Sequence, residues 1–211
     1  MRPNRRTGAE SPHESNRRTL VYYPIIHDQV DLGALGASVK KAALKKTGLG
    51  AWKRKLQIID RLWTDISKSI DLLSLSYDRV RIYQDGLPVC GKEIDIVKDL
   101  AGAGSRNHVL LLRMIDRGAR LMGTESLEML VEECERAESG LEERASSSQK
   151  TEHLAGPSLL DRRDAFIARR INETLLGGEV GMLFLGMLHN LAPWLDGDIE
   201  VIYPIQRPLE R

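Results

Sequence analysis

Short apolar runs alternate with longer amphipathic segments along most of this sequence, and that alternation limits the fold more than any other feature. The runs are rich in aliphatic and β-branched residues and are bounded by polar residues, glycine or proline, which predicts β-strands. They cover residues 19–26, 79–86, 119–123, 179–186 and 198–204. Strands separated in this way by helices predict a single α/β domain over 19–205, with a largely parallel sheet and helices on both faces.

The segments between the strands carry apolar residues every three or four positions, the spacing of an amphipathic helix. The clearest case lies between residues 52 and 73, where one face holds Leu56, Ile59, Trp63, Ile66, Ile70 and Leu73. Other helices are predicted at 33–48, 91–101, 105–117, 126–145 and 158–176. Gly48 and Gly50 are expected to end the first of these helices, and Ser105 is expected to cap another.

Composition sets expectations for the chain's flanking segments and partners. Residues 1–18 are charged and nearly free of apolar side chains, which predicts a disordered basic and polar tail. Residues 146–158 are polar and contain glycine and proline, which is typical of a mobile surface loop. The longest apolar stretches fall short of the ~18–20 residues that cross a bilayer. With a formal net charge of +1, nothing indicates a nucleic-acid or membrane partner.

The two cysteines, Cys90 and Cys134, lie in different segments without the spacing of a zinc site or a disulfide framework. A cytoplasmic location is therefore the default expectation. Cys90 is predicted to be a small buried side chain rather than a nucleophile. His108 lies in the first turns of the helix at 105–117, and we predict a surface position for it.

Polar side chains follow four of the predicted strands at the point where each strand ends. They are His27 and Asp28 after the first, Gln84 and Asp85 after the second, Glu125 after the third, and His189 after the fourth, which ends at Gly186. In an open parallel sheet, sites form outside the carboxyl ends of the strands, so these side chains are expected to share one rim. Histidines beside carboxylates suit a divalent transition metal or acid–base chemistry near neutral pH.

Each of these residues also has a structural interpretation. A histidine at a strand end is more often a hydrogen-bonded capping residue than a ligand. Asp85 precedes glycine, a pair that is typical of a tight turn. Glu125 is placed to favour the positive N-terminus of the helix that follows it. The coincidence of such residues on one rim favours a site over the separate structural explanations.

The helix at 158–176 adds an arginine on its apolar face, Arg163. A buried guanidinium is costly unless it is paired, so two interpretations stay open. In one, Arg163 forms an ion pair with Asp85, Glu125 or Asp164. In the other, Arg163 reaches the rim and binds a carboxylate or an oxyanion of a ligand. Gly186 would let the backbone pass close to a bound group, and a helix predicted at "NLAPWL" would offer free amide groups at its start.

The segment "RRDAFIARRINETLLGGEVGMLFLGMLHNLAPWL" resembles the C-terminal signature of the TraB/ChaN/erythromycin-esterase-like superfamily, in which an Arg-Asp helix leads to an apolar strand and a Gly-x-x-His motif. Gly186 and His189 match that motif. The family's first Gly-x-x-His is similar to "PIIH", where His27 keeps the spacing and Pro24 replaces the glycine. Glu125 in "LMGTE" matches the glutamate that ends a middle strand. The resemblance implies metal-dependent peptide cleavage, ester hydrolysis, or haem or iron binding.

Two functions remain as alternatives. The first is a metal-dependent hydrolase that acts on a small-molecule or peptide substrate with a divalent metal ion as its cofactor. The expected roles are metal ligation by His27, His189 and Glu125, catalysis by Glu125, Arg163 and Asp85, and ligand binding by Gly186, Asp28 and Gln84. The second is a non-catalytic module that holds a small anionic ligand, a haem or a metal at the same rim. The sequence leaves a homo-oligomer, and an interaction protein with an inert rim, open.

Overall fold

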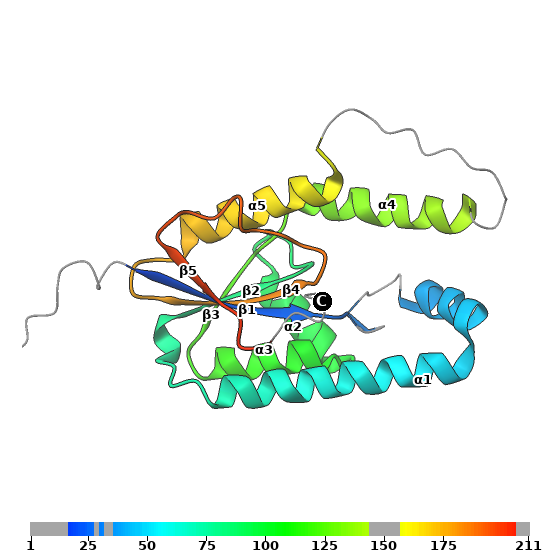
Figure 1. The fold of residues 1–211 in the computed structure, drawn as a ribbon, viewed down its shortest axis with the longest axis horizontal. Coiled ribbons are helices and arrows are strands. Elements are labelled where there is room, and N and C mark those ends of the chain that lie inside the picture. Colours follow the sequence, from blue (N-terminus) through cyan, green and yellow to red (C-terminus); the bar gives the residue numbers. More distant parts are fainter. Residues whose placement is uncertain (1–16, 28–29, 32–35, 144–156, 206–211) are drawn as a thin grey trace, which may run out of the picture.

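A parallel sheet between two layers of helices forms the body of the protein (Figure 1). The computed structural model describes residues 17–27, 30–31, 36–143 and 157–205. The strands are β1 (Arg18–Ile25), β2 (Val80–Gln84), β3 (Arg120–Met122), β4 (Val180–Gly186) and β5 (Ile199–Ile202). They form a five-stranded sheet in the order β3-β2-β4-β1-β5, and every neighbouring pair is parallel. The predicted α/β class is confirmed.

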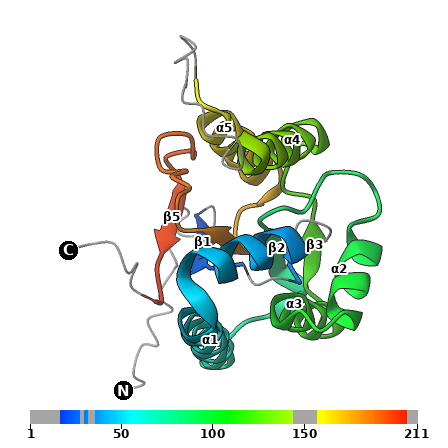
Figure 2. The same ribbon diagram turned by 90° about the vertical axis from the view of Figure 1, so that its right-hand side faces the viewer.

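The helices divide between the two faces of the sheet (Figures 1 and 2). One face carries α1 (Gly36–Asp71), α2 (Glu93–Gly102) and α3 (Arg106–Asp116), and the other carries α4 (Leu127–Glu143) and α5 (Leu159–Thr174). The chain moves along the sheet from β1 to β2 and then to β3 at its edge. It then returns to form β4, which lies between β1 and β2. Because parallel crossovers are right-handed, this reversal sends the helices before β4 to the opposite face.

Side chains of the central strands alternate between two apolar cores. Leu20 and Tyr22 of β1 pack with Ile167 and Ile171 of α5, whereas the neighbouring Tyr23 belongs to the core beneath α1 and α3. Strands that are covered on both faces need apolar residues at consecutive positions, which is why β1 and β4 are near-continuous apolar runs. The stripe predicted on the 52–73 helix is buried at Ile59, Trp63, Ile66 and Ile70.

Gly48 breaks α1 into two helical segments. Its backbone adopts φ 77° and ψ 168°, a conformation that side-chain-bearing residues rarely take, and the helix resumes directly after it. The predicted end of the first helix at Gly48 therefore corresponds to a kink. Ser105 caps α3 as predicted, since its side chain accepts a hydrogen bond from the amide of His108.

The structure corrects one boundary and one predicted helix. β1 begins at Arg18, whose side chain binds Asp198 and Asp196, so the predicted tail of 1–18 extends too far; residues 1–16 lie outside the described residues. The helix predicted at "NLAPWL" is wrong, because this segment forms turns. Pro193 disfavours a helical conformation at the residue before it.

Two further expectations concern a surface loop and membrane-spanning helices. Most of the predicted mobile loop, 146–156, lies outside the part of the chain that the structure describes. Within the described part, no helix combines the length and the apolar character needed to cross a bilayer.

Candidate functional site

The polar residues predicted at the strand ends converge on one edge of the sheet. Four neighbouring strands of the sheet, in the order β3-β2-β4-β1, end at this edge. The site residues at or shortly after their carboxyl ends are Glu125, Asp85, Gly186, His189 and His27. α5 contributes two further residues from above this edge. We call the connected set the rim cluster: His27, Asp85, Glu125, Arg163, Asp164, Gly186 and His189.

Asp85 is the centre of the rim cluster. Its Oδ2 accepts a hydrogen bond from the Gly186 amide at 2.8 Å and lies 3.0 Å from His27 Nε2 and 3.8 Å from His189 Nε2. Its Oδ1 accepts a hydrogen bond from Arg163 at 3.0 Å. Burial opposes ionisation of this carboxyl, but the hydrogen bond and charge of His27 and the charge of His189 outweigh it. They hold the pKa of Asp85 well below its usual range.

At Gly186, the last residue of β4, the backbone comes very close to Asp85. A Cβ atom added at this position would lie 3.0 Å from Asp85 Oδ2 and 3.5 Å from the His189 ring. The missing side chain lets the amide donate directly to the carboxylate. The glycine was predicted to allow close approach of a ligand, and the group that approaches it in the structure is Asp85.

Arg163 is only 5% exposed and is committed to three carboxylates. Its Nε and Nη2 bind the two oxygens of Glu125 at 2.6 and 2.7 Å, Nη2 also binds Asp85, and Nη1 lies 2.7 Å from Glu133. The structure thus shows the ion-pair interpretation, with Asp85 and Glu125 as partners. Asp164, the third expected partner of Arg163, binds His189 instead.

Glu125 and Gln84 are the most deeply buried of the predicted site residues that the structure describes. Glu125 is 1% exposed, and its Oε1 accepts the Gly86 amide at 2.8 Å in addition to Arg163. Burial raises the pKa of Glu125, and the ion pair with Arg163 offsets only part of that effect. Gln84 is also buried, and its side-chain amide donates to the backbone carbonyl of Asp85. Asp28, the remaining predicted ligand-binding residue, lies outside the described residues.

Asp164 holds His189. Its two oxygens lie 2.5 Å from His189 Nδ1 and 2.9 Å from the amide of Asn190, which donates to it. Because an ionised carboxylate can only accept, the proton between them belongs to Nδ1, and the neutral ring then has its lone pair on Nε2. The sequence signal for this residue was its helical spacing, since Asp164 lies three positions before the buried Ile167 and seven before Ile171.

A cavity of about 710 Å³ opens over the rim cluster, within the size range of small-molecule sites. Its walls are mainly apolar and come from β1, α2, α4, α5 and the segment after β4, including Ile26, Ile96, Leu100, Leu160 and Leu188. The polar side chains that line it are His27, Asp31, Asp85, His108, Glu133, Arg163 and His189. The cavity therefore combines an apolar envelope with a small set of convergent polar groups.

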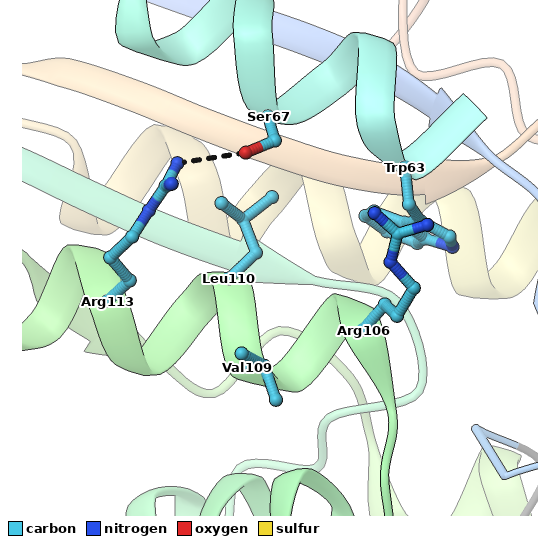
Figure 3. Close-up of a pocket in the computed structure, with 6 residues that line it drawn as sticks. All are labelled: Trp63, Ser67, Arg106, Val109, Leu110 and Arg113. Atoms are coloured by element: carbon cyan, nitrogen blue, oxygen red, sulfur yellow. Dashed lines mark hydrogen bonds between the residues drawn. The ribbon is translucent and has the colours of Figure 1, made fainter. Parts of the chain in front are cut away.

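A second hollow, of about 180 Å³, lies on the outer surface between α1 and α3 (Figure 3). It is lined by Trp63, Ser67, Arg106, Val109, Leu110 and Arg113. Its arginines are already bound, Arg113 to Ser67 and Asp71 and Arg106 to Thr64 and Asp60. The larger cavity, whose lining includes histidines and carboxylates, is the better candidate for chemistry.

Two predictions about single residues are wrong. His108 is 4% exposed, not at the surface, because Ser105 and Asp31 bind its ring. Cys90 is exposed rather than buried. It lies in the turn before α2, where its amide donates to Glu93.

The metal expectation required His27, His189 and Glu125 to surround one ion. Among the residues that the structure describes, no group of three or more His, Cys, Asp or Glu side chains is arranged to hold a metal ion. Comparison of the chain with protein-family models, curated proteins and solved structures finds no match.

The pairing of His27 with Asp85 predicts how stability depends on pH. Burial opposes protonation of His27, but the hydrogen bond and charge of Asp85 outweigh it and raise the pKa of His27. A raised histidine pKa stabilises the fold fully below the unfolded value of about 6.5 and loses that effect as the pH rises through the folded value. We expect the free energy of unfolding to decline across that interval in the wild type and to lose this part of the decline in His27→Gln.

Urea unfolding of both proteins at a series of pH values checks this expectation. Parallel curves, with the same decline in the variant, would show that His27 does not contribute to the pH dependence.

Proposed function

We propose that this chain is a hydrolase that cleaves ester or peptide bonds of small-molecule or peptide substrates in the cavity over the rim cluster. The observation that carries the proposal is the Asp164–His189 pair, which turns the Nε2 atom of a buried histidine toward Asp85 beside the cavity. An imidazole oriented by a carboxylate through Nδ1 is the arrangement that lets Nε2 act as a general base.

Water is activated by His189. The 3.8 Å between His189 Nε2 and Asp85 Oδ2 is too long for a direct hydrogen bond, so the lone pair of Nε2 is left to accept a proton from a water molecule in the cavity. His189 takes the proton as the water oxygen attacks the carbonyl carbon. Asp164 keeps the ring oriented and stabilises the imidazolium that forms.

His27 supplies positive charge to the same reaction. Its raised pKa favours the protonated ring, and Asp85 holds that ring through Nε2. The Nδ1–H then remains to donate to the oxyanion that develops on the substrate carbonyl. The side chain of His27 is 27% exposed and lines the cavity, which supports this role.

The proposal assigns water activation to His189 rather than to a divalent ion. The oxygens of Glu125, the third expected ligand, already accept Arg163 and the Gly86 amide. Gly186 and His189 resemble the Gly-x-x-His motif of the TraB/ChaN/erythromycin-esterase-like superfamily, and this resemblance also supports hydrolysis. Membership of that superfamily stays a proposal. The alternative of an anion-binding module is less favoured, because the guanidinium of Arg163 is taken up by carboxylates.

The two cysteines provide a matched test of where hydrolysis takes place. Both are free and exposed, but only Cys134 of α4 lines the cavity. In Cys90→Ser, alkylation of the remaining thiol with N-ethylmaleimide is expected to block hydrolysis of a panel of esters, because the adduct occupies the substrate space. In Cys134→Ser, complete alkylation of Cys90 is expected to leave the rate unchanged.

Mass spectrometry gives the extent of labelling, and the rate is measured on the same samples. Full activity in the fully alkylated Cys90→Ser protein would place the reaction outside this cavity. Absence of hydrolysis from every unlabelled protein, over esters and peptides of varied size, would contradict the proposed function itself.

A further inference from the structure

A second set of hydrogen-bonded residues reaches the same cavity from the other side of the sheet. Ser105 Oγ lies 2.5 Å from Asp31 Oδ1 and 2.7 Å from His108 Nδ1, and His108 Nδ1 lies 3.4 Å from Asp31 Oδ1. Ser105 and His108 belong to the start of α3, and Asp31 belongs to the segment between β1 and α1. All three side chains are almost fully buried. None of them has a role in the reaction described above.

The hydrogen-bond capacity of Ser105 fixes the orientation of the His108 proton. A hydroxyl has one hydrogen to donate and two lone pairs. The hydrogen goes to the Asp31 carboxylate, which can only accept, and one lone pair accepts the backbone amide of His108. The second lone pair must then accept a proton from His108 Nδ1, since the hydroxyl has no second hydrogen. Nε2 is left as the atom of His108 that can exchange a proton with a ligand.

Both His108 and Asp31 line the cavity that contains His27 and His189. His189 is held by Asp164 of α5 on one face of the sheet, whereas His108 is held by α3 on the other. The charge of Asp31 also contributes to the electrostatic environment of His27. The cavity therefore contains two imidazoles that are oriented through Nδ1 from opposite faces of the sheet.

We propose that His108 is a general acid that protonates the leaving group in this cavity, an inference that rests on the proposed hydrolase function. When the tetrahedral intermediate collapses, the bond between the acyl carbon and the leaving oxygen breaks and its electron pair stays on that oxygen. The oxygen takes the proton from Nε2 of protonated His108. His189 holds the proton removed from water, and exchange with solvent returns both rings to their starting states.

Ester substrates with different leaving groups test this role. A p-nitrophenolate departs without protonation, whereas an alkoxide needs a proton as the bond breaks. His108→Gln is therefore expected to lower kcat on an alkyl ester about 100-fold, the lower range for general acid catalysis, while changing kcat on the matched p-nitrophenyl ester little. Ser105→Ala, which removes the group that orients Nδ1, is expected to show the same selectivity with a smaller loss. It provides the test if His108→Gln does not fold.

The control is Val109→Ala, an exposed position on the same helix. It is expected to change neither rate. Equal losses on the two esters in His108→Gln and Ser105→Ala would overturn the assignment of a general acid and leave the proposed hydrolase standing. If the wild-type protein hydrolyses neither ester nor any peptide, the proposed function is overturned, and the role of His108 with it.

Discussion

Asp164→Asn is expected to lower kcat for ester hydrolysis about 10³- to 10⁴-fold, the effect of holding a catalytic imidazole in the wrong tautomer. The asparagine amide would face His189 Nδ1 as a donor in place of the carboxylate acceptor, so the neutral ring would carry its proton on Nε2. Nε2 then has no lone pair for the attacking water. The shape of the side chain is conserved, so most of the fold's stability should remain, which thermal unfolding checks.

Glu173→Gln is the matched control for this variant. It removes a carboxylate from the same helix, but Glu173 is exposed and its nearest cation, Arg170, lies 3.8 Å away. We expect its kcat to equal that of the wild type. A kcat for Asp164→Asn within a few-fold of the wild-type value would show that His189 does not act as the base.

Arg163→Ala is expected to reduce the free energy of unfolding by about 3–5 kcal/mol, the usual cost of breaking a buried ion pair by removing one partner. The substitution would leave Asp85 and Glu125 buried as neighbouring carboxylates without their shared cation. Arg163→Lys should lose less, because it keeps a charge but cannot bind both oxygens of Glu125 with a planar guanidinium.

The adjacent arginine is the matched control. Arg162 pairs with Glu132, and its side chain is 45% exposed, so Arg162→Ala is expected to cost about 1 kcal/mol or less. Denaturant unfolding of the three variants and the wild type gives the comparison. Similar losses in Arg162→Ala and Arg163→Ala would mean that the buried network around Asp85 contributes little to stability.

The sheet could be predicted from local pattern because its central strands are buried on both faces. β1 and β4 are near-continuous apolar runs, and their observed ends at Ile25 and Gly186 differ little from the predicted ones. The turn segment after His189 could not be predicted in the same way. A helix is predicted there, but the segment is short and Pro193 lies in its middle. The segment forms turns instead of a helix.

The rim was predictable because parallel strands end at a common edge, a consequence of topology that needs no knowledge of side-chain contacts. That argument places Asp85 and His189 together but cannot say which atom each of them binds. Arg163 and Asp164 are adjacent in α5, yet one binds the carboxylates and the other binds His189. Such partner choice depends on packing between α5 and the sheet, which pattern alone does not determine.

His108 is a residue whose burial could not be predicted from the local sequence pattern. The sequence places it in the first turns of a helix and predicts a surface position. Its buried ring is bound by its own N-cap, Ser105, and by Asp31, which lies far away in the sequence. A contact between segments so far apart leaves no periodic signal in either one.

The measurement that tests the central proposal most directly is the rate of ester hydrolysis by the wild-type protein after removal of divalent ions, beside His189→Gln prepared in the same way. We predict that the chelated wild type retains its kcat and that the variant loses about 10²- to 10⁴-fold, the contribution of a positioned base. A wild-type rate that vanishes on chelation and returns with a divalent ion, or a variant as active as the wild type, would contradict water activation by His189.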